Sequence, residues 1–328
     1  MLAAALAVPA HALETDQFYA WTRPLKDATE PFNRKINAEI ASVLGRVNAR
    51  RHPESCRCES VASAIRRHFD YVIIARPELW AMKTSLLDRV PANADEEPRF
   101  RRDYLFGATS PLDRVRWMPP SPTVEASGIR FGTDKLGHLL SDGALVEHVY
   151  RRALKHGASK DEALRRALRY SIGTEHTIWG QSSSGIFSLG DLEANYQGMM
   201  FYRGLCDEAD PALTLTERGW RLSRPFDLAV YVTPEWDESW QPNIYGAWRW
   251  KKTKPVMLRH CAELSDPEVR RRRADYAARD RETPTEKALF GLVAAGALDD
   301  PVQYTIDAVC GDPVRTLTPG VERPGSSR

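Results

Sequence analysis

Apolar residues recur at helical spacing through most of the chain. Residues 30–51 carry apolar positions that fall on one face of a helix, with charged residues between them: Phe32, Ile36, Ile40, Val43, Leu44 and Val47. Residues 60–74 and 77–90 repeat this amphipathic pattern, and a denser helical region follows from 133 to 205. Residues 259–281 and 285–297 also have helical spacing. The pattern therefore predicts a mainly α-helical protein.

Two stretches break the helical pattern. Residues 91–131 hold many prolines and charges with weak periodicity, which predicts a loop or linker. Residues 220–250 hold five of the nine tryptophans, and residues 226–232 resemble a short strand. We therefore expect a multi-helix, bundle-like core with a loop-rich, aromatic-rich segment and a short β element.

These breaks divide the chain into regions. We expect an N-terminal helical region over 13–90, a Pro-rich linker over 91–131 and a helical core over 132–206. An aromatic-rich segment with C-terminal helices follows over 207–318, and a Pro/Gly/Ser-rich tail closes the chain at 319–328. The length of 328 residues suits two domains or one large one.

Composition narrows the function classes. Hydrophobic residues make up 42% and charged residues 27%, as in a globular protein. Lys and Arg total 46 against 44 for Asp and Glu, and this balance gives no basis for nucleic-acid binding. After residue 12 no apolar run reaches the length of a membrane-spanning helix, so we expect none there.

The first twelve residues are apolar and end in Ala10-His11-Ala12, which fits a secretory cleavage site. The basic start of a signal peptide is missing, and a start codon placed too far downstream would explain this. The alternative is a loose N-terminal tail of a cytosolic protein. We expect a periplasmic or secreted bacterial protein, in which disulfides persist. The five cysteines are compatible with two bridges and one free thiol, in a pairing that spacing does not reveal.

Three polar clusters lie within the central helical region. In Gly132-Thr-Asp134-Lys135-Leu-Gly-His138, the aspartate and the histidine are four apart, which places them one helical turn apart on one face. In Gly173-Thr-Glu175, the glutamate lies beside the apolar stripe of its helix. In Ser188-Leu-Gly-Asp191-Leu-Glu-Ala-Asn195, the aspartate and the asparagine again share a face. The clusters predict polar groups pointing into a helical core.

Each cluster also has a structural explanation. Asp134 and Asp191 stand where acids cap helices, since Ser188 precedes Asp191 by three. His138 alone is typical of a satisfied core histidine. Three helices that bring polar groups to inward faces nevertheless form the kind of place where bundles hold metals or catalytic groups.

The order Asp-Lys-x-x-His, Gly-x-Glu and Ser-x-x-Asp-x-x-Ala-Asn-x-x-Gly resembles the core signature of VanZ-like bacterial envelope proteins. The resemblance covers residues 132–200, and it implies an envelope role and a single site formed by Asp134, His138, Glu175, Asp191 and Asn195. VanZ-like proteins are small membrane proteins, whereas the helices here carry many arginines. Gln usually follows the Glu closely in that family, whereas here His176 follows directly.

The residue types suggest a metal-dependent hydrolase acting on an envelope lipid, phosphoester or glycan. Asp134, His138 and Asp191 would bind a divalent cation, for which Zn²⁺ or Mn²⁺ suits the donors. Glu175 would be the general base, Asn195 would orient a ligand and Lys135 would neutralise an anion. Without a metal, Glu175 and His138 would form the acid–base pair.

Substrate contacts are expected from the aromatic segment and from the loop between the second and third clusters. Trp236, Trp240 and Tyr245 would stack on a sugar, although such rings often only fill a core. Ser183 would contribute to an anion-binding loop. The alternative function is a non-enzymatic envelope protein, in which the clusters are a packing network and the Trp-rich segment binds glycan or a protein. Peripheral membrane association fits either alternative, and the sequence leaves the oligomeric state open.

Overall fold

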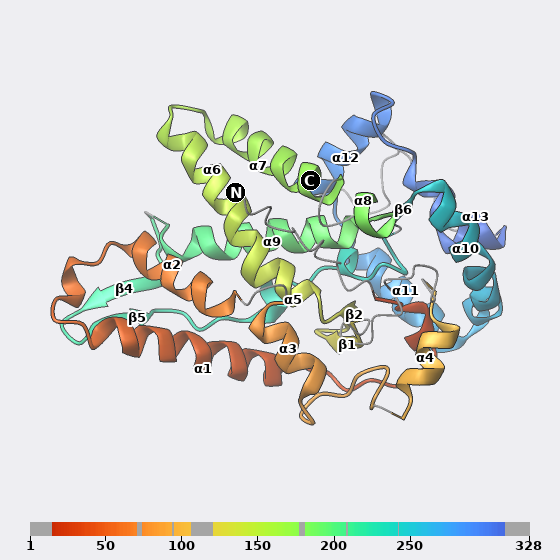
Figure 1. Cartoon of the computed structure of the whole chain (residues 1–328), viewed down its shortest axis with the longest axis horizontal. Coiled ribbons are helices and arrows are strands. Elements are labelled where there is room, and N and C mark those ends of the chain that lie inside the picture. Colours follow the sequence, from red (N-terminus) through yellow and green to blue (C-terminus); the bar gives the residue numbers. More distant parts are fainter. Residues whose placement is uncertain are drawn as a thin grey trace, which may run out of the picture.

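The computed structural model describes residues 15–70, 74–93, 95–105, 121–176, 181–207, 209–241 and 243–311. The expected leader at 1–12 and the expected tail at 319–328 lie outside these residues. The described chain is mainly helical with short strands, which confirms the fold class expected from periodicity (Figure 1). Within the described residues, the helices are too short or too polar to cross a membrane.

The N-terminal helices follow the apolar pattern. They are α1 (Thr29–Asn48), α2 (Cys58–Phe69) and α3 (Arg76–Lys83), with the short 3₁₀ turns η1 (Phe18–Ala20) and η2 (Pro53–Ser55) before α1 and α2. All six apolar positions that defined the first predicted helix are buried in α1. α3 ends at Lys83, earlier than expected, where Thr84 and Ser85 favour helix interiors poorly.

The region expected to be a linker contains regular structure, so that expectation is wrong in part. It holds α4 (Glu97–Asp103) and an antiparallel hairpin of β1 (Thr123–Ala126) and β2 (Ile129–Gly132). Ser127 and Gly128 both have positive φ at its turn, as tight two-residue hairpins require. All four residues of β2 are buried, and the side chain of Arg130 is satisfied there by hydrogen bonds to the backbone oxygens of Trp21 and Arg23.

The central region is built around helix α9, which runs through the middle of the molecule (Figure 1). Its elements are α5 (Lys135–Gly137), the π-helical turn η3 (His138–Asp142), α6 (Gly143–Lys155), α7 (Lys160–His176), α8 (Gln181–Ser184), β3 (Ile186–Phe187) and α9 (Leu189–Leu205). The hydroxyl of Ser159 accepts the N–H of Glu162 at 3.2 Å and caps the start of α7, as the spacing of Ser and Glu in a capping motif predicts. Helix α9 is buried on nearly its whole circumference, so polar groups on two of its sides face the interior.

The C-terminal part consists of short elements around α9. They are β4 (Leu213–Thr216), β5 (Gly219–Leu222), η4 (Leu228–Val230), η5 (Pro234–Trp236), β6 (Ile244–Tyr245), α10 (Ala247–Met257), η6 (Leu258–Ser265), α11 (Pro267–Arg279), α12 (Pro284–Ala294), η7 (Pro301–Tyr304) and α13 (Ile306–Cys310). The predicted strand at 226–232 is instead the 3₁₀ turn η4, because the Asp227 carboxylate accepts the N–H of Ala229 and caps that turn. The strands occur elsewhere, and β6 pairs with β3.

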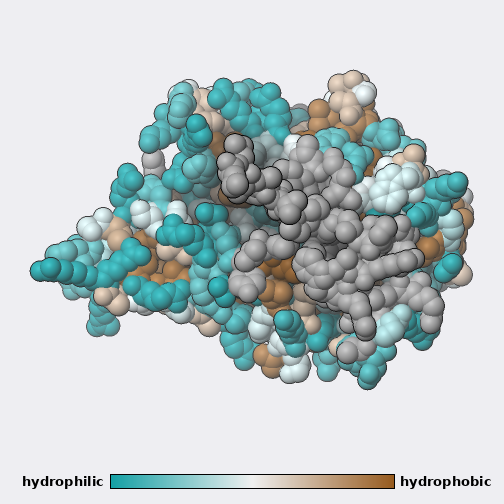
Figure 2. All heavy atoms as spheres, in the orientation of Figure 1, coloured by the Kyte–Doolittle hydropathy of each residue, from teal (hydrophilic) through white to brown (hydrophobic). Residues whose placement is uncertain are grey.

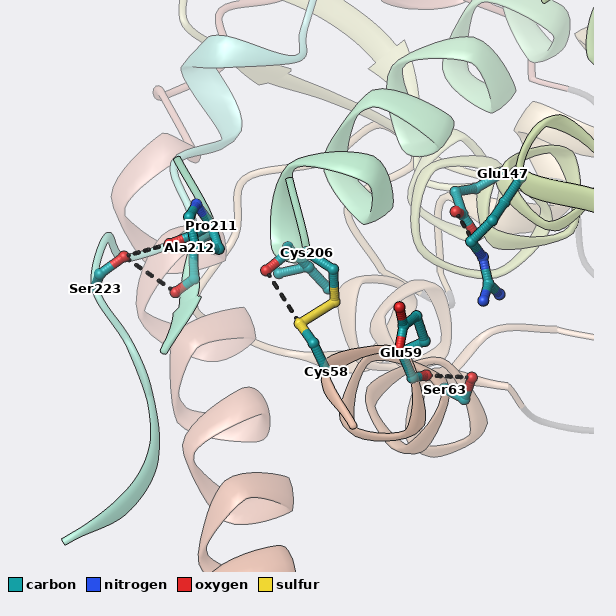
Figure 3. Close-up of a disulfide and its surroundings, with 10 residues drawn as sticks. Cys58, Glu59, Ser63, Glu147, Cys206, Pro211, Ala212 and Ser223 are labelled. Atoms are coloured by element: carbon teal, nitrogen blue, oxygen red, sulfur yellow. Dashed lines mark hydrogen bonds and ion pairs between the residues drawn. A yellow bond between two sulfur atoms is a disulfide. The ribbon is translucent and has the colours of Figure 1, made fainter. Parts of the chain in front are cut away.

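Two disulfides join distant parts of the chain. Cys58 at the start of α2 is bonded to Cys206 at the end of α9 (Figure 3), and Cys261 is bonded to Cys310. Cys56 has a free thiol, so the five cysteines form two disulfides and leave one thiol, as the sequence allowed. Figure 2 shows one face of the molecule, which is largely hydrophilic where described and carries an apolar patch over α12.

Candidate functional site

The buried side chain of Lys135 is the centre of the polar network. It is completely buried in α5, and its Nζ lies 2.7 Å from Asp134 Oδ2 and 2.6 Å from Asp191 Oδ1. A third carboxylate, Glu238, follows η5 and places Oε1 2.5 Å from the same Nζ. One ammonium group therefore contacts three carboxyl groups that come from three parts of the chain. Burial raises the pKa of Glu238 to about 7 in spite of this contact, so Glu238 is the member of the three that holds a proton most readily. The pKa of Lys135 is held well above its usual value because these carboxylates outweigh the effect of burial.

His138 extends the network toward solvent. Its Nε2 lies 3.3 Å from Asp191 Oδ1, and its Nδ1 lies 3.2 Å from Asp142 Oδ2 and 3.1 Å from Asn195 Oδ1. Burial alone would lower the pKa of His138, but Asp191 and Asp142 hold it well above its usual value. The ring is therefore an imidazolium at neutral pH. The side chain of Asp142 is 42% exposed, so the network meets solvent at this residue.

Asn195 and Ser171 fix the orientation of the histidine. The amide nitrogen of Asn195 donates to Ser171 Oγ at 3.2 Å, which leaves its oxygen facing His138. Because Asn195 lies one turn after Asp191 on α9, both side chains reach the same ring. Asn195 thus acts on the site through His138.

Glu175 lies on the inward face of α7 and is buried. The backbone N–H of Ser188 donates to its Oε1 at 2.9 Å. Burial, and then the charge of Asp191, raise the pKa of Glu175 to about 8. Glu175 therefore carries a proton at neutral pH. Asp191 has the opposite shift: His138 and Lys135 outweigh burial and hold its pKa below the usual range.

Ser188 caps α9 as its spacing predicted, with its Oγ accepting the N–H of Asp191 at 3.1 Å. The capping motif does not use the carboxylate of Asp191, which faces Lys135 and His138. Ser188 Oγ also donates to Glu238 Oε1 at 3.1 Å. The cap therefore uses the backbone N–H of Asp191, and its carboxylate belongs to the buried network.

The structure brings together all six residues singled out in the three clusters, and it adds three that the sequence analysis missed. Glu238 was hidden in the aromatic segment, and Asp142 lies one turn beyond His138. Glu78 in α3 is buried, and burial followed by the charge of Asp134 raises its pKa to about 8. A Cβ at position 137 would approach Glu78 Oε2 to 2.9 Å, so Gly137 makes room for this carboxyl group. The sequence signal for Glu78 was its place three residues before buried Ala81.

The three predicted metal ligands lie close enough to share one ion. One donor atom each from Asp134, His138 and Asp191 lies within 4.8 Å of the others. The residue types and spacing fit a divalent cation. In this structure the same atoms are engaged by the ammonium of Lys135 and by the protonated ring of His138. A cation would therefore have to displace the Lys135 contacts and the proton of His138.

The expected sugar platform is corrected by the structure. Trp236, Trp240 and Tyr245 are 0%, 7% and 3% exposed. Trp236 packs edge-on against Phe131 and Tyr245 stacks on Trp250, so these rings fill the core and leave no open face for a sugar. The fourth expected contact, the Ser183 side chain, lies outside the described residues.

Comparison with protein-family models, with curated proteins and with solved structures finds no match to this chain. The resemblance to VanZ-like proteins therefore depends on the three motifs alone.

Proposed function

We propose that this chain is an exported hydrolase of the bacterial envelope that uses acid–base chemistry at the Lys135–His138 network. The observation that carries the proposal is the opposite shift of two neighbouring carboxyl groups. Glu175 keeps its proton to about pH 8, whereas Asp191 is ionised below its usual range. Such divergence of neighbouring pKa values is how hydrolases separate an acid from an ionised partner in one site.

The residues would divide the work as follows. Glu175 would donate a proton to the leaving group, because it is protonated at neutral pH. A water molecule would attack the substrate as this bond breaks, and the proton that the water loses would restore the acid form of Glu175. The imidazolium of His138, at the solvent edge, would stabilise negative charge on a substrate oxygen. Lys135 and Asp191 would hold that ring charged and in place. This assignment replaces the expected base role of Glu175, which would require pH above about 8.

A metal-bound form of the same site is the second version of this proposal. Asp134, His138 and Asp191 would hold Zn²⁺ or Mn²⁺, and the ion would act as a Lewis acid and lower the pKa of a water. Metal content, measured by mass spectrometry on protein purified without a metal-affinity tag, separates the two versions. One ion per chain that is lost in the double variant Asp134→Ala/His138→Ala would favour the metal version.

Export is supported by two observations. The segment Ala10-His11-Ala12 fits a cleavage site, and two disulfides are characteristic of oxidising compartments. An envelope lipid, phosphoester or glycan is then the substrate class that such a location provides, and peripheral contact with a membrane is compatible with it.

The proposal is tested with a panel of chromogenic probes. The chain from Leu13 onward would be assayed on bis(p-nitrophenyl) phosphate, p-nitrophenyl butyrate and p-nitrophenyl glycosides. Glu175→Gln should lower turnover by about 100-fold or more, since positioned acids contribute at least this much. The wild-type rate should fall above about pH 8, as Glu175 loses its proton. Glu268→Gln, on the exposed side of α11, is the matched control.

Activity that is unchanged by Glu175→Gln would refute the assignment. Absence of activity on every probe would favour the second candidate, a non-enzymatic envelope protein. The complete burial of Lys135 among three carboxylates is the observation that favours this candidate, because a packing network needs no access to solvent. In that case His138→Ala should destabilise the fold by about 1–3 kcal/mol, as loss of a buried partner does.

A further inference from the structure

A second group of carboxylates lies on another side of α9. Glu193 of α9, Glu235 of η5 and Glu286 of α12 are 1%, 2% and 3% exposed. Asp280, which follows α11, is partly buried beside them. One carboxylate oxygen each from Glu235, Asp280 and Glu286 lies within 4.8 Å of the others. Glu193 adjoins these three residues, because α9 packs against both η5 and α12 and the Glu193 carboxyl group lies beside Thr283 and Thr285 at the start of α12.

Hydrogen bonds satisfy only part of this group. Glu286 accepts the N–H of Thr283 at 3.1 Å and closes the capping box of α12, and Glu193 Oε1 accepts from Gln197 Nε2 at 2.8 Å. Glu193 Oε2 and Glu235 Oε1 are buried and lack a hydrogen bond of good geometry within the described residues, and the hydroxyls of Thr285 and Thr233 are the neutral groups nearest to them. An unpaired buried carboxylate oxygen is costly, so the group calls for a ligand.

A neutral side chain points to the same ligand. Gln241 is 2% exposed and donates its Nε2 to Glu286 Oε1 at 3.3 Å, which places its amide at the carboxylate group. Its Oε1 is buried without a hydrogen-bond partner among the described residues. This amide oxygen has no hydrogen-bond donor within those residues, and carboxylates cannot supply one. A bound cation would satisfy it.

Within the described chain, the second group differs from the first network because it lacks a buried lysine. There the ammonium of Lys135 contacts three carboxyl groups. Here, within the part of the chain that the structure describes, no ion pair joins Glu193 or Glu235 to a Lys or Arg, and the charges that act on Glu235 are the carboxylates of Glu193 and Glu286. Burial and the charge of Glu193 accordingly raise the pKa of Glu235 to about 8, so without a cation Glu235 holds a proton at neutral pH, and a bound cation would displace it.

We propose that Glu193, Glu235, Asp280 and Glu286, with the amide oxygen of Gln241, bind one divalent cation of the calcium type. Hard oxygen donors without His or Cys exclude the soft metals, and Ca²⁺ accepts six to eight oxygens in irregular geometry. The ion would tie together α9, η5, the end of α11 and the start of α12.

This second site adjoins the first through one short segment. Glu235 and Glu238 are three residues apart, and the segment lies close against α9 at Gly190. A Cβ there would approach Lys135 Cε to 3.1 Å and the backbone oxygen of Glu235 to 3.2 Å. A cation bound at Glu235 would therefore hold in place the segment that supplies Glu238 to Lys135.

The experiment measures calcium binding by the full chain from Leu13 after treatment with a chelator. Equilibrium dialysis with CaCl₂ should give one ion per chain, and Tm should rise by about 5 °C at a calcium concentration of 100 times Kd. Glu235→Gln and, separately, Glu193→Gln should weaken binding about tenfold or more, because the donors lose charge. Glu78→Gln is the matched control, since it is an equally buried glutamate at the first network, and it should bind calcium as the wild type does.

The glutamine variants replace a carboxylate by an amide of the same shape, so the metal-free variants should stay folded, which far-UV circular dichroism checks. No bound calcium in the wild type at millimolar concentration would overturn the proposal. Equal binding by the wild type and Glu235→Gln would overturn the location. Tighter binding of Mg²⁺ or Mn²⁺ that is lost in Glu235→Gln would support the site but overturn its assignment to calcium.

Discussion

Replacement of Lys135 by methionine tests the central claim about the buried network. Methionine keeps much of the length and apolar character of the lysine stem and removes only the ammonium group. In the wild type, that group contacts Asp134, Asp191 and Glu238 at 2.5–2.7 Å with no exposure to solvent. The variant therefore leaves buried carboxylates without their principal cation.

The expected loss of stability can be worked out from the least costly way in which the folded variant can restore charge balance. One of the aspartates must take up a proton to restore neutrality. The ordinary pKa of an aspartate lies about three units below pH 7, and at 1.36 kcal/mol per unit this protonation costs about 4 kcal/mol. At pH 5 the gap is about one unit and the cost falls to about 1.5 kcal/mol. The value at pH 7 agrees with the roughly 3–5 kcal/mol lost when one partner of a buried ion pair is removed.

The assay is urea unfolding of the wild type and of Lys135→Met at pH 7 and pH 5. The control is Lys35→Met in α1, where the lysine is 32% exposed and lies 2.6 Å from Glu39 Oε1. An exposed pair of this kind contributes at most about 1 kcal/mol, so the control should unfold nearly as the wild type does. A loss below about 1 kcal/mol for Lys135→Met at pH 7, or a loss that does not shrink at pH 5, would refute the reasoning.

Three further predictions concern other parts of the structure. Because the folded-state pKa of His138 is raised, the stability that its charge contributes is fully present below about pH 6.5 and is lost as pH rises through the folded-state pKa. Urea unfolding at several pH values should show that His138→Gln removes this loss of stability at alkaline pH. Replacing both Cys58 and Cys206 by alanine opens a loop of 148 residues and should cost about 2–5 kcal/mol in urea unfolding, whereas Cys56→Ser should change stability by under about 0.5 kcal/mol; equal effects would contradict this. A Cβ at Gly198 would lie 2.2 Å from the backbone oxygen of Leu139, so Gly198→Ala should lower stability by about 3 kcal/mol or prevent folding. Gly204 lies on the same helix with open space around it, so Gly204→Ala should raise stability by up to about 1 kcal/mol. Thermal melts compare the two variants.

The two carboxylate groups lie on different sides of one helix, and this arrangement explains why α9 is so thoroughly buried. Asp191 faces Lys135, and Glu193, two residues later, faces η5 and α12. A two-residue step turns a side chain by about 200°, so neighbouring acids on one helix serve separate groups. The helix therefore carries carboxyl groups inward on both sides, where Lys135 balances one side and the proposed cation would balance the other.

Features that depend on neighbours along the chain were predictable from the sequence. The buried face of α1 follows from the 3.6-residue period, and the caps at Ser159 and Ser188 follow from local hydrogen bonding. The grouping of Asp134 with His138 and of Asp191 with Asn195 also follows, because a helix places residues four apart on one face.

Tertiary structure decided which partners these side chains meet and which of them carry a charge. Glu238 reaches Lys135 across 103 residues, and no local pattern relates the two. The hairpin at 123–132 was missed because the prolines and charges of residues 91–131 favoured a linker, although both strands alternate polar and apolar residues. The tryptophans expected to bind sugar are enclosed by elements far away in the sequence. The charge states differ most from expectation: Glu175 is protonated and His138 is charged, since a pKa depends on burial and on nearby charges in space. The sequence by itself determined which residues share a helix face, and only the folded chain decided which of them carry a proton.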